Sequence, residues 1–197
     1  GSPVKVTTTT LEMLAAPATA ARSFPEGVRL DRATDVPPEY ARFLYGLVGG
    51  PWNWTDRLAW SRQQWLDELA VPGTEFWILY GDGIPFGYVH LHPQPVDGGT
   101  SVEIRYFGLA EAAIGRGLGG RLLEHGIRAA WTVHERAALA PVVRVWVHTC
   151  TLDGEAALAN YQARGLVVVG SEDTDEDVAD EPLGSWRATG GPAPASA

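Results

Sequence analysis

Hydrophobic residues recur with two different periods along this chain, and the two periods predict two kinds of element. Runs rich in branched and aromatic residues predict strands, whereas apolar residues at three- and four-residue spacing predict amphipathic helices. The predicted strands cover residues 28–33, 76–80, 86–91, 101–109, 142–147 and 166–169, with 183–188 as a further candidate. The predicted helices cover residues 37–48, 55–70, 117–137 and 153–164. This order describes an α/β sandwich around a mixed sheet.

Turn and cap residues support several of these boundaries. A proline pair opens the first helix, and the Gly-Gly-Pro sequence at 49–51 ends it. Thr55 is the expected N-cap of the second helix. Glycines at 81–83 and 98–99 predict hairpin turns, which join the neighbouring strands in antiparallel order.

Both ends of the chain lack this periodicity. Residues 1–26 mix Thr, Ala and Pro, and predict an N-terminal arm that is disordered unless it docks. We expect one domain over residues 27–189 and a disordered tail over 190–197. Seven acidic residues without a positive charge lie between positions 171 and 181, where we expect a solvated loop between strands.

Composition and charge narrow the class of protein. A chain of 197 residues with 45% hydrophobic residues fits one globular domain. No apolar run approaches the roughly 20 residues of a membrane-spanning helix. A single cysteine excludes an intramolecular disulfide and fits a reducing, cytoplasmic location. The net charge of −9 opposes nucleic-acid binding, although an acidic surface could attract a cationic amine.

A glycine-rich loop between a predicted strand and a predicted helix is the most informative motif. Its residues are Ile114, Gly115, Arg116, Gly117, Leu118, Gly119 and Gly120. Glycine allows tight turns and close approach of a ligand to backbone N–H groups. A helix N-terminus adds unpaired donors and partial positive charge, so the loop predicts a pyrophosphate cradle.

Several interpretations of this cradle compete. The spacing matches the dinucleotide motif G-x-G-x-x-G, but the next predicted strand ends in residues 147–149, Val-His-Thr, without the acidic residue of a Rossmann fold. A Walker A loop is excluded because no Lys-Ser or Lys-Thr follows the glycines. Coenzyme A is the third candidate ligand, and a plain turn before a buried helix needs no ligand.

The stretch from Glu103 to Gly120 resembles the GNAT acetyltransferase superfamily. The family's cofactor loop has Gln or Arg, two residues, Gly, any residue, then Gly or Ala; residues 117–119 match its second half and Ile114 stands at the Gln or Arg position. Residues 145–149 and 156–166 resemble the strand and aromatic-bearing helix that follow in the family. The resemblance implies a mixed, largely antiparallel sheet of six to seven strands flanked by about four helices.

The same resemblance implies acetyl-coenzyme A as cofactor and direct transfer of its acyl group to an amine in a ternary complex. The implied cofactor contacts are Phe107, Gly108, Leu109, the loop residues 114–120, Asp153 and Asn160. Tyr161 is the implied general acid that protonates the leaving thiolate, because a phenol is protonated at neutral pH. Glu103 is the implied base. Tyr161 as a core residue and Glu103 as an ion-pair partner of Arg105 remain alternatives.

Other residue groups give weaker indications. His90, His92 and His148 could suggest a metal, but no carboxylate partner is identifiable and we predict no metal site. Cys150 is expected to be a spectator thiol rather than an acylated nucleophile.

Four of the eight tryptophans cluster between positions 52 and 65. The resemblance places the acceptor wall here, with Trp52, Trp54 and Asp56 as candidates for holding an apolar or cationic acceptor. A core or homodimer contact is the alternative. For the whole chain, a non-catalytic acyl-coenzyme A sensor is the alternative to an enzyme that acylates a small-molecule or peptide amine.

Overall fold

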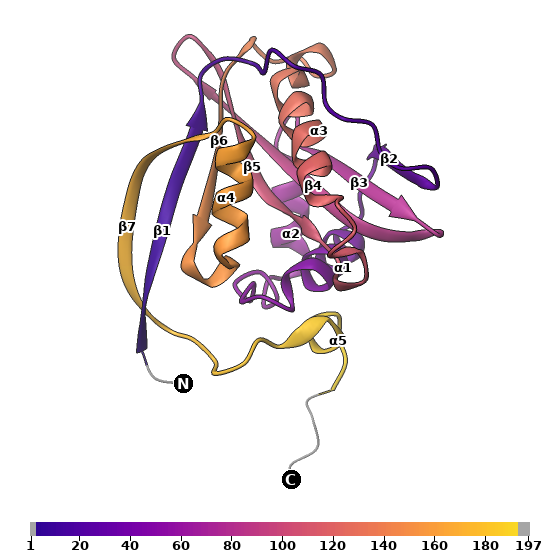
Figure 1. Ribbon diagram of the computed structural model, residues 1–197, viewed down its shortest axis with the longest axis vertical. Coiled ribbons are helices and arrows are strands. Elements are labelled where there is room, and N and C mark those ends of the chain that lie inside the picture. The colour runs from indigo at the N-terminus through magenta and orange to yellow at the C-terminus, as the bar shows by residue number, and fades with distance from the viewer. Residues whose placement is uncertain (1–2, 193–197) are drawn as a thin grey trace.

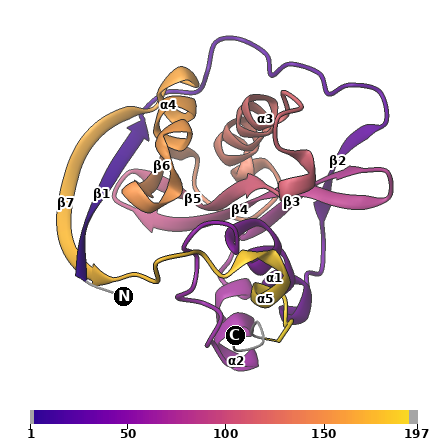
Figure 2. The same ribbon diagram turned by 60° about the horizontal axis from the view of Figure 1, so that its bottom comes forward.

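A seven-stranded sheet runs through the computed structural model, which describes residues 3–192, and helices cover both of its faces (Figure 1, Figure 2). The strands are β1 (Pro3–Met13), β2 (Val28–Ala33), β3 (Glu75–Gly81), β4 (Ile84–Val96), β5 (Gly99–Leu109), β6 (Val142–Cys150) and β7 (Val167–Asp177). The helices are α1 (Pro38–Gly49), α2 (Arg62–Leu69), α3 (Gly119–Trp131), α4 (Glu155–Ala163) and α5 (Gly184–Ala188). The predicted α/β class and strand number are confirmed.

The strand order is β2-β3-β4-β5-β6-β1-β7, and every neighbouring pair among the described residues is antiparallel except β5 with β6. A parallel pair needs a long crossover, and here the crossover carries α3. The pairing of β5 with β6 runs only from Thr100 opposite Val142 to Glu103 opposite Trp146. Beyond Glu103 each strand continues without the other, so a gap opens between them.

Two apolar clusters pack against opposite faces of the sheet. Helix α3 covers one face with an apolar stripe of near-zero exposure that includes Leu122 and Ile127. Helices α1 and α2 cover the other face, where Leu44 and Trp65 pack against Ile78 of β3. Figure 2 shows the sheet between these two layers. The alternation of side chains along each strand decides which cluster each residue joins.

The N-terminal segment differs from the sequence prediction. Where the sequence predicts an arm, residues 3–13 form β1, which lies between β6 and β7 and bonds to both. The cause is long-range, because the backbone groups of this threonine-rich segment find their partners in strands more than 100 residues away.

The acidic segment is also a strand rather than the predicted loop. Residues 172–177 belong to β7 and pair with β1. Asp173 accepts a hydrogen bond from Thr7 at 2.6 Å and forms an ion pair with Lys5 at 3.1 Å. The partner strand therefore supplies donors and a positive charge that local sequence does not reveal.

Two helix boundaries and one element type are corrected. Helix α2 begins after Ser61, whose side chain and that of Gln64 form a capping box, and Thr55 is not its N-cap. Helix α3 ends at Trp131 and a 3-10 turn follows. The predicted last strand, 183–188, is helix α5, which lies against α1 (Figure 2). Of the predicted tail, residues 193–197 lie outside the described residues.

Candidate active site

A β-bulge re-aims the side chains of β5 beside the gap. His90 of β4 pairs with Tyr106 and Leu91 pairs with Ile104, so Arg105 has no partner residue. Arg105 and Tyr106 therefore both face the α1–α2 layer, and Phe107 turns back to the α3 layer. Without the bulge, the alternation of side chains would put Arg105 and Tyr106 on opposite faces of the sheet. With the bulge, both lie on the α1–α2 face.

Gly108 of β5 lies close to α1. A Cβ atom on Gly108 would lie 2.6 Å from Val48 Cγ1 of α1 and 3.9 Å from Trp54 Cη2. A larger residue at this position would require the Val48 side chain to move. The backbone of residues 107–109, which is predicted to contact the cofactor, therefore lies close to α1 at the edge of the gap.

Tyr161 of α4 lies on the α3 side of the gap. It is 6% exposed, and its ring packs edge-on against Phe107 at a centroid distance of 6.0 Å. Burial, and then the charge of Asp153, raise the pKa of Tyr161 well above its usual value. The hydroxyl therefore keeps its proton at neutral pH. The position is compatible with either of the predicted roles, core packing or proton donation.

The glycine-rich loop has the conformation that an anion cradle requires. Gly115 and Gly117 have φ angles of 83° and 72°, a region that side chains disfavour. Helix α3 begins at Gly119, and no side chain caps the helix N-terminus. Its first N–H groups are therefore available to a ligand. Asn160 lies beside this start, 3.5 Å from the Gly119 carbonyl oxygen to which its amide donates.

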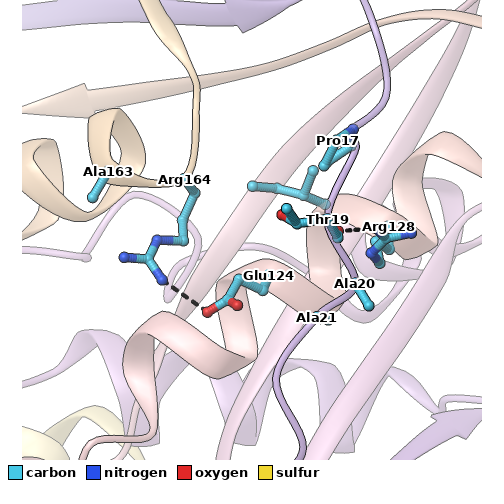
Figure 3. Close-up of a pocket in the computed structure, with 9 residues that line it drawn as sticks. Pro17, Thr19, Ala20, Ala21, Glu124, Arg128, Ala163 and Arg164 are labelled. Atoms are coloured by element: carbon cyan, nitrogen blue, oxygen red, sulfur yellow. Dashed lines mark hydrogen bonds and ion pairs between the residues drawn. The ribbon is translucent and has the colours of Figure 1, made fainter.

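Arginines from two distant segments flank the cradle. Arg22 and Arg164 both pair with Glu124 of α3, at 2.5 Å and 2.8 Å. Figure 3 shows the pair between Arg164 and Glu124. A Cβ atom on Gly120 would lie 3.0 Å from Arg22 Nη2 and 3.2 Å from Arg164 Nη1. Arg116, within the loop, lies 4.7 Å above the ring of Phe86. Arg22 comes from the segment between β1 and β2, and no sequence motif marks it.

Two tryptophans that precede α2 contact residues just after β6, across the gap from β5. Trp54 donates from its indole nitrogen to Asp153 at 3.1 Å and lies 5.6 Å from both Tyr45 and Tyr106. Trp52 lies against Gly154, where a Cβ atom would meet its ring at 3.1 Å. Trp52, Trp54 and Asp153 are thus brought together. Asp56 is exposed and stands apart from this contact.

Asp153 organises the end of β6. Besides Trp54, it accepts hydrogen bonds from the backbone N–H of Cys150 at 3.0 Å and from Thr149 at 3.3 Å. Burial and the nearby Asp153 raise the pKa of Cys150 to about 11. His148 bonds to Thr10 at 3.0 Å instead of contacting the thiol. The thiol therefore stays protonated at neutral pH beside the Asp153 carboxylate, which favours the spectator role.

A chain of ion pairs lies on the α1–α2 face beside the bulge. Arg105 donates to Glu103 at 2.8 Å and forms a second ion pair with Glu68 of α2 at 2.5 Å. The side chains of Glu103 and Glu68 are 12% and 8% exposed. Glu103 therefore has the ion-pair partner that its strand position suggests. Glu68 lies on another element, and no sequence pattern connects it with Glu103.

His90 and His92 share this face. His90 is fully buried, packs 4.3 Å from Phe76, and has no hydrogen-bond partner on either ring nitrogen among the described residues. Burial, followed by the charge of Arg105, holds the pKa of His90 well below its usual value. Glu68, His90 and His92 place their ligand atoms within 4.8 Å of one another. Arg105 already supplies the positive charge to Glu68, which disfavours a divalent cation there.

Comparison of the sequence with models of known protein families gives a match to one family of acetyltransferases. A model of the acetyltransferase (GNAT) family matches residues 39–166. No curated protein matches the sequence. No helix within residues 3–192 has the length and apolar character to cross a membrane.

Solved structures of low sequence identity share the fold. A GCN5-related N-acetyltransferase from Sphaerobacter thermophilus is 17% identical with a TM-score of 0.52, over 88% of this chain and 52% of that one. A tandem GNAT protein from the clavulanic acid biosynthesis pathway is 18% identical with a TM-score of 0.59, over 91% and 55%. Arabidopsis thaliana Naa50, in complex with the bisubstrate analogue CoA-Ac-MVNAL, is 18% identical with a TM-score of 0.51, over 73% and 85%. This chain thus spans about half the length of the first two.

Proposed function

The chain belongs to the GNAT acetyltransferase family, and we propose that it transfers an acetyl or other short acyl group from acyl-coenzyme A to a primary amine. The observation that carries the proposal is the gap where the pairing of β5 with β6 ends at Glu103. The uncapped glycine cradle lies at one end of this region and Tyr161 beside it. Backbone groups of residues 107–109 would hold the thioester, and the cradle would hold the pyrophosphate.

The reaction needs a neutral amine, a polarised carbonyl and a proton for the leaving sulfur. The amine nitrogen forms a bond to the acyl carbon while the carbon–sulfur bond breaks. In our proposal Glu103 takes a proton from the ammonium group, directly or through water, and Tyr161 gives its proton to the thiolate. A backbone N–H of residues 107–109 polarises the carbonyl.

The two proposed catalytic groups come from opposite faces of the sheet. Tyr161 belongs to the apolar cluster under α3 and α4, whereas Glu103 belongs to the charged chain beside α2. The gap is the place where a bound thioester could meet both. This arrangement supports a ternary complex, in which cofactor and acceptor approach from different sides, without a covalent intermediate on Cys150.

The class of acceptor is a proposal of its own. A small-molecule amine and a peptide N-terminus both fit an entrance lined by Trp52 and Trp54. The Naa50 structure carries an analogue with a peptide portion, which supports the peptide option. A second candidate function is an acyl-coenzyme A sensor, which the packing of Tyr161 against Phe107 in the apolar cluster supports, because a purely structural tyrosine would have the same surroundings.

The test begins with thermal unfolding in the presence of acetyl-coenzyme A, with NAD and ATP as controls. We expect acetyl-coenzyme A alone to raise the melting temperature. Thiol release is then measured with an amine panel for the unaltered chain, Tyr161→Phe and the matched control Tyr88→Phe, a buried tyrosine on the other face. Tyr161→Phe should lower turnover by about 100-fold or more and retain cofactor binding.

Each contrary outcome has a defined meaning. A melting shift with NAD in place of acetyl-coenzyme A would overturn the cofactor assignment. Cofactor binding without thiol release from any amine would favour the sensor. Equal turnover for Tyr161→Phe and Tyr88→Phe would remove Tyr161 from the mechanism.

A further inference from the structure

Arg57 is a cationic side chain at the proposed acceptor entrance that forms no ion pair within residues 3–192. Of the arginines around it, Arg62 pairs with Glu39 at 2.6 Å and Arg105 pairs with Glu68 and Glu103. Arg42 forms no ion pair within residues 3–192 but donates to the Leu58 carbonyl oxygen at 3.2 Å. In a chain with net charge −9, acidic partners are abundant. An arginine left without one in a half-buried position therefore calls for an explanation.

The guanidinium of Arg57 is held in place from several directions. It lies 4.3 Å above the ring of Trp60, and its Nε donates to the Tyr106 hydroxyl at 2.9 Å. The backbone N–H of Arg57 donates to the Tyr45 hydroxyl at 3.4 Å. These contacts fix one face and one edge of the group. The two terminal nitrogens have no hydrogen-bond partner among the described residues, and this second edge matches the two oxygens of a carboxylate.

The position of Arg57 connects it with the gap. Tyr106 is the bulge residue next to Arg105 and lies two positions before Gly108. Trp54 lies 5.6 Å from Tyr106 and bonds to Asp153 at the end of β6. Arg57 is therefore separated from the proposed reaction centre by one layer of aromatic side chains, on the same face as Glu103.

Charge on this face is divided between two places. Glu68 and Glu103 exceed Arg105 by one negative charge at the proposed amine end, while Arg57 adds a positive charge at the aromatic end. A substrate with an ammonium group and an oxyanion would complement both. An amine without an oxyanion would leave the guanidinium unpaired when substrate displaces water from the entrance.

We propose that Arg57 binds an oxyanion on the acceptor, so that the substrate is an amine that also carries an acid group, with a carboxylate as the simplest form. This inference rests on the proposed acyltransfer. It differs from the sequence-based expectation of an acceptor cation held by tryptophan faces, because the cation beside Trp60 belongs to the chain itself.

The experiment compares matched acceptors. Thiol release from acetyl-coenzyme A is measured with amino acids whose amine and carboxylate are separated by chains of increasing length, with the corresponding amino amides, and with aminoalkyl phosphonates. The chains are the unaltered protein, Arg57→Gln, Arg57→Lys and Arg62→Gln, the last removing a nearby exposed charge. We expect kcat/KM for the acids to exceed that for the amides by about 10- to 100-fold, the range of a charge-assisted hydrogen bond.

Arg57→Gln should abolish this preference chiefly through KM for the acids, Arg57→Lys should restore part of it, and Arg62→Gln should keep it.

Preference for the phosphonates over the amino acids would keep the oxyanion site and assign it to a phosphate-like group. Equal rates for acids and amides in the unaltered protein would overturn the inference and leave the acyltransfer intact. An equal loss of kcat/KM for acids and amides in Arg57→Gln would also overturn the inference. A residue that only holds the loop in place would affect both kinds of acceptor alike. Thiol release with none of the amines would overturn both proposals.

Discussion

The two faces of the sheet hold their charged groups differently. On the α3–α4 face, Glu124 pairs with Arg22 and Arg164 at the rim, and the Arg22 side chain is 51% exposed. On the α1–α2 face, Glu68 is 8% exposed and pairs with Arg105 beneath the bulge. Rim arginines can exchange a carboxylate for a phosphate at little cost, because water solvates both states. Buried charges cannot exchange partners in this way.

This difference in exposure suits the two faces to different tasks, binding of a ligand at the rim and positioning of a side chain in the buried ion pairs. The rim is suited to holding a polyanionic cofactor that must enter and leave. The buried chain is suited to keeping Glu103 in one place while a substrate changes beside it. The two faces of one sheet thus differ in how they hold charge: the α3–α4 face has ion pairs at its rim, and the α1–α2 face has buried ion pairs.

The largest expected effect tests the buried half of this comparison. Arg105→Ala leaves the buried carboxylates of Glu68 and Glu103 without the cation between them, and we expect a loss of about 3–5 kcal/mol in the free energy of unfolding. The matched change at the rim, Glu124→Ala, should cost about 1 kcal/mol or less. Urea unfolding measures both. Similar losses for the two variants would mean that the faces do not differ in this respect.

The second prediction concerns the backbone of the cradle. Gly117→Val forces a branched side chain to a φ of 72° and should weaken acetyl-coenzyme A binding by about 10- to 100-fold, measured by titration calorimetry. Gly83→Val introduces similar strain at a φ of 80° in the β3–β4 turn. That control should lose stability and retain cofactor affinity. Equal affinities for the two variants would argue against a cofactor at this loop.

The third prediction uses the pH dependence of the rim. Hydrogen bonds from Arg22 hold the pKa of Glu124 at about 2, below its usual value, despite partial burial. A lowered folded-state pKa contributes stability above the unfolded-state value, and this contribution disappears as pH falls through the folded-state value. The stability gap between the unaltered chain and Glu124→Gln should therefore be full at pH 7 and shrink between about pH 4.5 and pH 2. A gap that is constant with pH would exclude the ion pair as its source.

The smallest effect is expected at the end of β6. Cys150→Ser should change turnover by less than about twofold, because the pKa of Cys150 is raised to about 11 and its thiol stays protonated. Alkylation of the unaltered chain near pH 8 should be correspondingly slow. A large loss of turnover would assign Cys150 a part in the reaction and would contradict transfer in a ternary complex.

The sequence predicted what local patterns can specify. The period-two and helical patterns located most of the strands and α1, α3 and α4, because burial of one face imposes its period on the residues themselves. The glycine loop was recognisable because positive φ angles restrict the choice of residue. Its role in binding, like the roles of Tyr161 and Glu103, stays a prediction.

Other features depended on segments that meet only in the folded chain. Strand β1 lies inside the sheet because β6 and β7 supply its hydrogen-bond partners, and the acidic β7 is a strand because β1 supplies donors to it. The Glu68–Arg105–Glu103 chain, Arg22 at the cradle and Arg57 at the Tyr106 hydroxyl each join elements far apart in sequence. Periodicity determined which face of an element is buried; only tertiary structure decided what each buried group meets, because pairing between distant segments leaves no local pattern.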